Sequence, residues 1–162
     1  MNNTLLPPDL VAMIARGVSV IVAGRDQALR PSLMRAVGSR IDAQGGEITV
    51  FLSRPQSRQV IQDIAATGHI AVVFSEPPTH RTVQVKASQA RMRNAVAEDQ
   101  PALASYLLSM EHEIAQVGFP PEATRAMLAH KLEDLVAISF TPEQAFDQTP
   151  GPRAGTRLGG AR

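Results

Sequence analysis

The sequence contains no cysteine and no tryptophan, and its aromatic residues are one tyrosine and five phenylalanines among 162 residues. Without cysteine the chain can form no disulfide, no reactive thiolate and no cysteine-ligated zinc site. So few aromatic rings leave little to stack against nucleic-acid bases. These absences argue against a disulfide-stabilised scaffold, cysteine catalysis and a base-stacking nucleic-acid-binding protein.

A strong charge of one sign and a long apolar stretch are also missing. The chain has 16 Lys and Arg against 15 Asp and Glu, a net charge of +1, which gives no support for a polyanionic partner. No apolar run approaches the roughly 18 residues that a membrane helix needs, and the first residues lack the charged and apolar regions of a signal peptide. We therefore expect a cytoplasmic protein that binds neither nucleic acid nor membranes.

Short runs of apolar or alternating residues predict six strands, and apolar residues at helical spacing predict four helices. Hairpin-length links and few helices favour an antiparallel barrel over a doubly wound sheet. The expected fold class is mainly β with helices, an α+β six-stranded barrel. The predicted strands cover residues 18–22, 32–41, 48–52, 70–74, 81–86 and 135–140; the predicted helices cover 8–17, 59–67, 103–117 and 120–131.

The end of the chain differs in composition from the rest. From Thr141 it is rich in Pro, Gly and Arg and has no periodicity. Such a segment cannot bury enough apolar surface to offset the entropy of ordering it. We therefore predict one domain over residues 1–141 and a flexible tail over 142–162.

The most informative segment is the junction 53–58, Ser-Arg-Pro-Gln-Ser-Arg, between a predicted strand and a predicted helix. A helix N-terminus offers unpaired N–H groups and a partial positive charge. The hydroxyls of Ser53 and Ser57 and the guanidiniums of Arg54 and Arg58 add donors suited to a phosphate. The alternatives are that a serine only caps the helix and that the arginines are solvated. Arginine is mildly unfavourable at a helix start unless an anion is present, which favours the phosphate site.

Three segments together resemble the pyridoxamine 5'-phosphate oxidase-like FMN-binding split-barrel superfamily. They are 30–38, Arg-Pro-Ser-Leu-Met-Arg-Ala-Val-Gly; 51–58, Phe-Leu-Ser-Arg-Pro-Gln-Ser-Arg; and 80–86, His-Arg-Thr-Val-Gln-Val-Lys. In this family the first lies along the flavin, the second grips the FMN phosphate, and the third is the strand that follows. The resemblance covers roughly residues 10–141 and implies a split barrel of the FMN-binding type.

The resemblance also implies a cofactor, a partner and a site. The cofactor would be FMN, and the partner would be a second copy of the chain, with the cofactor site at the homodimer interface. The flavin would serve a small organic substrate or NAD(P)H. The implied cofactor-binding residues are Arg35, Ala36, Val37, Gly38, Ser53, Arg54, Ser57, Arg58 and Gln84.

Other interpretations of these residues remain open. Arg35 could lie on a solvated strand face, Gln84 on an exposed barrel face, and 36–38 could simply pack. The four histidines, His69, His80, His112 and His130, lack metal-ligand spacing. His80 is the histidine of most interest, because it neighbours the third predicted ligand strand. The alternation of that strand places Arg81 on the same face as Val83, which makes Arg81 a weaker candidate.

The family's pyridoxamine phosphate oxidases carry a lysine after the first segment and a Trp-containing end. This chain has Gly38-Ser39-Arg40 and no tryptophan, although Arg157-Leu158 matches an Arg-Leu motif. Vitamin B6 oxidation itself is therefore not expected. Two function classes remain: a flavin-dependent oxidoreductase, and a non-catalytic flavin- or haem-binding or sensing module on the same fold. A purely structural dimer is a third possibility.

Overall fold

A computed structural model of the protein describes residues 5–159. Within this range the helices are α1 (Pro8–Arg16), α2 (Arg58–Thr67), α3 (Gln100–Ala115) and α4 (Pro121–Met127), with 3-10 turns η1 (Ala97–Asp99) and η2 (Leu132–Asp134). Helices α1, α3 and α4 each carry a proline in the first turn, where its missing N–H breaks no helical hydrogen bond.

The strands form two antiparallel sheets. The six-stranded sheet has the order β10-β9-β6-β5-β1-β2, and the four-stranded sheet has the order β3-β4-β8-β7. Their bounds are β1 (Ser19–Arg25), β2 (Pro31–Arg35), β3 (Gly38–Ile41), β4 (Ile48–Ser53), β5 (Ile70–Ser75), β6 (Thr82–Ala87), β7 (Arg91–Asn94), β8 (Leu135–Phe140), β9 (Gln144–Asp147) and β10 (Thr156–Arg157).

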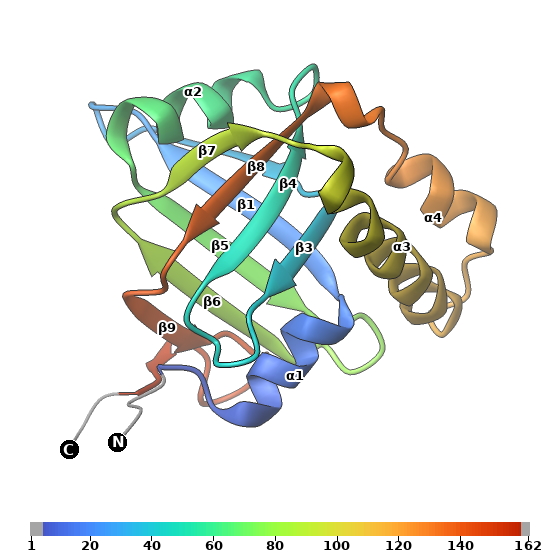
Figure 1. Cartoon of the computed structure of the whole chain (residues 1–162). Helices are drawn as coiled ribbons and strands as arrows, with labels where there is room; N and C mark the ends of the chain where they lie inside the picture. The colour runs from blue at the N-terminus through green and yellow to red at the C-terminus, as the bar shows by residue number, and fades with distance from the viewer. Residues whose placement is uncertain (1–4, 160–162) are drawn as a thin grey trace.

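The two sheets face each other across the main core, and α1 and α2 cover the two ends of the space between them (Figure 1). Strands β1, β5 and β6 alternate buried and half-buried residues, because only one face of their sheet meets this core. Strand β4 is buried throughout, because α3 covers its other face. The predicted fold class, an antiparallel split barrel with helices, is confirmed; the two sheets of the described residues do not join into one closed barrel.

The predicted single strand 32–41 is divided in the structure. Strand β2 pairs with β1 in one sheet, and β3 pairs with β4 in the other. The amide of Ala36 donates to the carbonyl of Val20 at 3.0 Å, and the amide of Val37 donates to the carbonyl of Phe51 at 2.9 Å. The chain therefore crosses from one sheet to the other between these two residues. The residue pattern of 32–41 does not reveal this crossing, because both halves are extended.

The segment expected to be a flexible tail forms regular structure in its described part, up to residue 159. Strand β9 pairs with β6, and Ala145 is fully buried. The amide of Leu158 donates to the carbonyl of Ala145 at 2.8 Å. The prediction that structure ends at residue 141 is therefore wrong, because β9 lies between β6 and β10 and is held by hydrogen bonds to both, so it needs few apolar residues of its own. Residues 160–162 of the predicted tail lie outside the described range.

Helix α3 is fixed at its start by a buried carboxylate. Asp99 is 1% exposed and accepts bonds from both terminal nitrogens of Arg93, at 2.7 and 2.8 Å, and from the amide of Val96 at 2.9 Å. The bonds from Arg93 hold the pKa of Asp99 below its usual value. Arg40 of β3 lies 3.4 Å from the same carboxylate, so the start of α3 is tied to β7 and β3.

No helix of the described residues is long and apolar enough to cross a membrane.

The C-cap of α2 tests how tightly this helix is held against the loop that follows β6. Gly68 has φ +72°, and a Cβ there would lie 2.6 Å from the backbone oxygen of Ser88. Gly118 also has positive φ, +95°, but a Cβ there meets nothing within 4 Å. Gly118→Ala should lower the free energy of unfolding by about 1 kcal/mol through backbone strain alone. Gly68→Ala should lower it by about 1–3 kcal/mol more, because backbone must move. Urea unfolding measures both, and equal losses would contradict the close approach.

Candidate functional site

The turn between β4 and α2 is held by backbone hydrogen bonds at both ends. The amide of Arg54 donates to the carbonyl of Asp134 at 2.8 Å, which ties the turn to η2. The amide of Gln56 donates to the carbonyl of Ser53 at 3.1 Å, and the amide of Ile61 donates to the carbonyl of Ser57 at 3.0 Å. Helix α2 therefore begins directly after Ser57, as the sequence predicts within one residue.

Ser57 is the unusual residue of this turn. It is 2% exposed, makes no side-chain cap bond, and its Oγ has no hydrogen-bond partner among the described residues. The alternative that Ser57 merely caps the helix is thus not what the structure shows. Buried hydroxyls are normally paired, and a helix N-terminus favours an anion. An unpaired hydroxyl at this place fits a group that accepts hydrogen bonds there.

The two arginines of the turn have different surroundings. Both are exposed, but the Nη2 of Arg54 donates to Oδ1 of Asn94 on β7 at 2.7 Å. Arg58 is the first residue of α2, and no acidic residue lies in the first turn of this helix. A positive side chain there is opposed by the helix dipole unless it meets an anion. Arg58 is therefore the better placed of the two to meet a phosphate beside Ser57.

The segment 36–38 lies beside this turn but contributes its side chains to packing. Ala36 and Val37 are 0% and 3% exposed, and a Cβ on Gly38 would lie 2.7 Å from Cδ2 of Leu103. Gly38 is opposite Phe51 in the register of β3 and β4, and continuing that register would place Ala36 opposite Ser53. The chain leaves the four-stranded sheet at that point, so its crossing between the sheets lies next to the turn.

Arg35 and Gln84 lie on the outward face of the six-stranded sheet. Both are half-buried, and the pairing runs Arg35–Ile21, Ile21–Val73 and Val73–Gln84. They stand at the two ends of one row across four strands, about 14 Å apart at ordinary strand spacing. Nη1 of Arg35 donates to Oγ of Ser19 at 2.8 Å, which holds it on this face.

The nine predicted residues therefore form two groups joined by the crossing of the chain. One group lies around the β4–α2 turn and the chain crossing next to it, and the other lies on the outward face of the six-stranded sheet. The first group is Ala36, Val37, Gly38, Ser53, Arg54, Ser57 and Arg58; the second is Arg35 and Gln84.

Sequence reasoning missed Ser19 and Asn94, which fix Arg35 and Arg54. Ser19 is a polar residue at the start of an apolar strand, a signal that could have found it. Asn94 belongs to β7, a strand that no apolar pattern in the sequence predicts.

His80 and Arg81, at the start of the third segment, make their contacts outside both groups. His80 is exposed in the turn before β6 with φ 61°, and Arg81 forms an ion pair with Asp9 of α1. Within residues 5–159 no group of three or more His, Asp or Glu side chains is placed to hold a metal ion.

Comparison with solved structures identifies the fold. No family model and no curated protein sequence matches the chain. Among solved structures, a predicted pyridoxamine 5'-phosphate oxidase of Lactobacillus delbrueckii has TM-score 0.53 and 14% identity, over 89% of this chain and 94% of that chain. An F420 reductase has TM-score 0.54 and 15% identity, over 86% and 98%. HutZ, the heme storage protein of Vibrio cholerae, has TM-score 0.51 and 15% identity, over 88% and 94%.

These likenesses extend over nearly the whole chain and confirm the resemblance at the level of the fold. The chain has the split-barrel fold of the pyridoxamine 5'-phosphate oxidase-like superfamily. Because all three identities are low, they do not say which cofactor or reaction belongs to this chain.

The unpaired hydroxyl gives a stability test of the turn. Ser57→Ala should leave the free energy of unfolding within about 0.5 kcal/mol of the parent or raise it, because no cap bond is lost and a buried unpaired group is removed. An ordinary capping serine would cost about 1 kcal/mol. Asp26→Ala is the positive control, since that carboxylate accepts bonds from the amides of Ala28 and Arg30. A loss for Ser57→Ala as large as for Asp26→Ala would show that Ser57 acts as a cap.

Proposed function

We propose that the protein is an FMN-binding flavoprotein that holds the FMN phosphate at the turn between β4 and α2. The observation that carries the proposal is the buried, unpaired Oγ of Ser57 at the start of α2, with Arg58 following it. Ser53 lies at the other end of the same turn, 7% exposed. Hydroxyls and a guanidinium at a helix N-terminus make a site for a dianionic phosphate.

The ring of the flavin would lie toward the outward face of the six-stranded sheet, where Arg35 and Gln84 supply a cation and an amide. An amide can donate to the ring carbonyls or accept from the ring N–H. Bound FMN would supply hydride or electron transfer with a small organic substrate or NAD(P)H. The residues of the chain would position the flavin and neutralise its phosphate. This is the function of an oxidoreductase.

The proposal includes a homodimer with the cofactor site at the interface. Leu33 of β2 is 65% exposed and lies opposite Ala23, on the same face as Arg35. An exposed apolar side chain beside the Arg35–Gln84 row suits a surface that a second copy covers. The partner would then enclose the ring, which this face alone leaves open to solvent.

A comparison of two flavins tests the phosphate site. FMN should bind more tightly than riboflavin, which has the same ring without phosphate. Arg58→Gln and Ser57→Ala should each weaken FMN binding by about tenfold or more and leave riboflavin affinity nearly unchanged, since each removes a bond to a charged group. Arg54→Gln should have a smaller effect, because Asn94 already holds that guanidinium. Quenching of flavin fluorescence on titration measures the affinities of the parent and the three variants for FMN and for riboflavin.

Arg157→Gln on β10 is the matched charge control. A parent protein that binds no FMN, or that binds FMN and riboflavin equally, would contradict the phosphate site. A Soret band in place of flavin absorption would support the alternative that HutZ suggests, a haem-binding or sensing module on the same fold. A flavin that binds but accepts no electrons from NAD(P)H or a reduced substrate would favour a non-catalytic binding module.

The interface is tested by introducing charge on the sheet face. Leu33→Asp should convert the dimer to a monomer and weaken FMN binding together, because the partner would no longer enclose the ring. Leu108→Asp on α3 is the comparison, since that residue is equally exposed, at 68%. Sedimentation velocity measures the oligomeric state. A monomeric parent would contradict the proposed dimer. A dimer that only Leu108→Asp dissociates would show that the interface is not on this face.

A further inference from the structure

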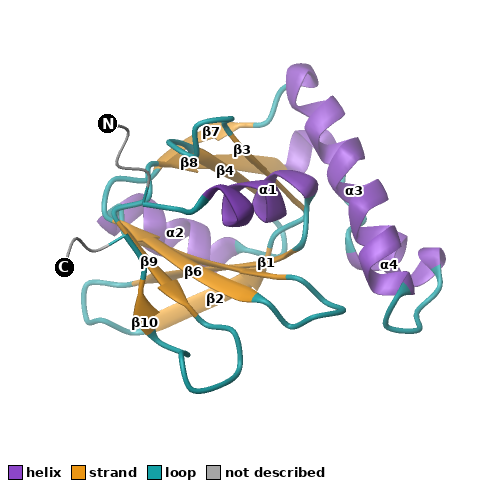
Figure 2. Cartoon of the chain, turned by 90° about the horizontal axis from the view of Figure 1, so that it is seen from below, coloured by secondary structure: helices purple, strands orange, loops and turns teal. Residues whose placement is uncertain are grey.

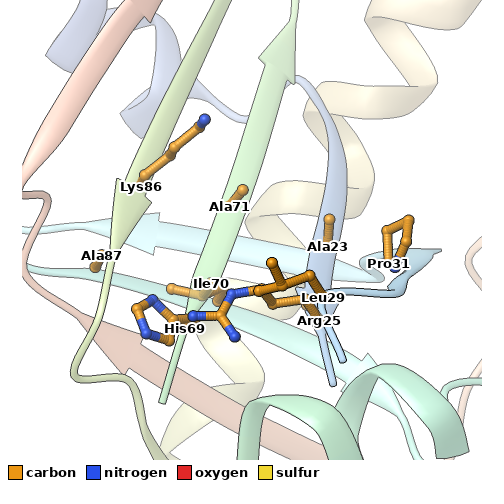
Figure 3. A pocket seen from close by; sticks show the side chains of 10 residues that line it. Ala23, Arg25, Leu29, Pro31, His69, Ile70, Ala71, Lys86 and Ala87 are labelled. Atoms are coloured by element: carbon orange, nitrogen blue, oxygen red, sulfur yellow. The ribbon is translucent and has the colours of Figure 1, made fainter. Parts of the chain in front are cut away.

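A cavity of about 360 Å³ opens on the six-stranded sheet, at the end where β1 turns into β2 and β5 begins. Side chains from β1, β5, β6 and the β1–β2 loop line it, and none of the nine predicted FMN-binding residues does (Figure 3). The proposed FMN site therefore does not explain this cavity.

The floor of the cavity consists of small apolar side chains. Ala23 lies opposite Ala71, and Ala71 lies opposite Lys86, in one row across three strands. The next outward row contains Ile21 and Val73, whose side chains are larger. Two alanines side by side beside a row of branched residues leave a hollow in the sheet surface, suited to a flat apolar group.

The rim is basic. Arg25, His69 and Lys86 line the hollow; in Figure 3 the guanidinium of Arg25 points toward the imidazole of His69, and the ammonium of Lys86 points away from both. Within residues 5–159 none of the three forms an ion pair, whereas most arginines of the described chain do. Arg25 donates only a long bond, 3.3 Å, to the carbonyl of Asp26.

The ammonium of Lys86 lies 5.2 Å from the centre of the Phe146 ring. Glu143 lines a neighbouring pocket together with His69 and Lys86, and its carboxylate is bonded to the amide and hydroxyl of Ser88. Because Arg25 and Lys86 form no ion pair within the described residues, they can meet an anion without first breaking one.

One wall of the cavity is a strained residue. Leu29 has φ 64° and is 68% exposed, an unusual conformation for a branched side chain. The carboxylate of Asp26 fixes the loop by accepting bonds from the amides of Ala28 at 2.8 Å and Arg30 at 2.9 Å. The loop thereby holds an apolar side chain in water beside Arg25. Strain of this type is often retained at binding sites.

We propose that this cavity binds a small organic anion with a flat apolar body. The anionic group lies at Arg25 and His69, and the apolar body lies on Ala23 and Ala71 beside Leu29, with Lys86 adding positive charge at the other side of the hollow. The row of Ala71 and Lys86 is one step, about 7 Å, from the row of Gln84. If the proposed flavin function holds, the anion is the class of substrate that reaches the ring. Binding itself does not depend on the flavin.

The test is a titration of the ¹⁵N-labelled full chain, without flavin, with benzoate and with benzamide, its neutral analogue. Benzoate should shift the amide signals of Ala71 and Lys86 with a dissociation constant of about 1 mM, as expected for so small a ligand. Benzamide should bind at least about tenfold more weakly. Shifts confined to the turn 53–58, or equal affinity for the two probes, would overturn the proposal.

Charge-matched variants locate the anion. Arg25→Gln with Lys86→Gln should weaken benzoate binding by about tenfold or more. Lys131→Gln with Arg157→Gln removes the same charge elsewhere and should change the affinity by less than about twofold. Equal effects of the two pairs would reduce the observation to net charge and overturn the site.

Leu29→Gly separates binding from stability. It should raise or maintain the midpoint of urea unfolding, because glycine tolerates positive φ, and weaken benzoate binding. Unchanged binding would show that Leu29 is no part of the site. Loss of FMN affinity in the Ser57→Ala chain, with benzoate binding intact, would confirm that the two sites are independent.

Discussion

Two consecutive backbone amides determine how the two halves of this molecule meet. The N–H of Ala36 bonds into the six-stranded sheet, and the N–H of Val37 bonds into the four-stranded sheet. Because buried amides must be paired, the chain cannot shift along either sheet without losing one of these bonds. The crossing therefore sets where the sheets part. The register of β3 and β4 places the crossing beside Ser53, at the start of the turn that carries Ser57.

Helix α3 supports this crossing from outside. Figure 2 shows α3 and α4 as a pair at one side of the two sheets. Leu103 of α3 packs with Val37 and Phe51, and Gly38 has no side chain because Leu103 occupies that space. The start of α3 is in turn fixed by Asp99, whose charge is maintained by Arg93. A carboxylate this buried is stable as an ion only with such partners, so the pair also fixes the helix position.

How much of this could be read from the sequence depends on how each element is stabilised. The β4–turn–α2 unit was predictable because its apolar spacing changes from strand to helix at one proline-containing turn. Strand β7 was not, since only Met92 of its four residues packs against the core and the pairing with β8 supplies its stability. The division of 32–41 between two sheets was also hidden, because both halves are extended and their residues do not show which strand each half pairs with. Residue type predicted Arg54 to be a phosphate ligand, but its bond to Asn94 depends on the unpredicted β7.

Three local rules are broken in this molecule, and the places where they are broken are informative. Ser57 is buried without a partner, Arg58 opposes the dipole of its own helix, and Leu29 occupies a conformation that favours glycine. They are not the only departures in the described residues, since buried oxygens of Ser39, Glu113 and Thr124 also have no partner and His80 has φ 61°. A fold tolerates such departures when they serve binding and the surrounding contacts compensate for them. Of the first three, two lie at the turn and the third at the basic cavity. At both places an anion could meet donors or cations that have no such partner in the described residues. This is a stronger argument for ligand binding than the fold, since the same fold occurs in an F420 reductase and in a heme storage protein.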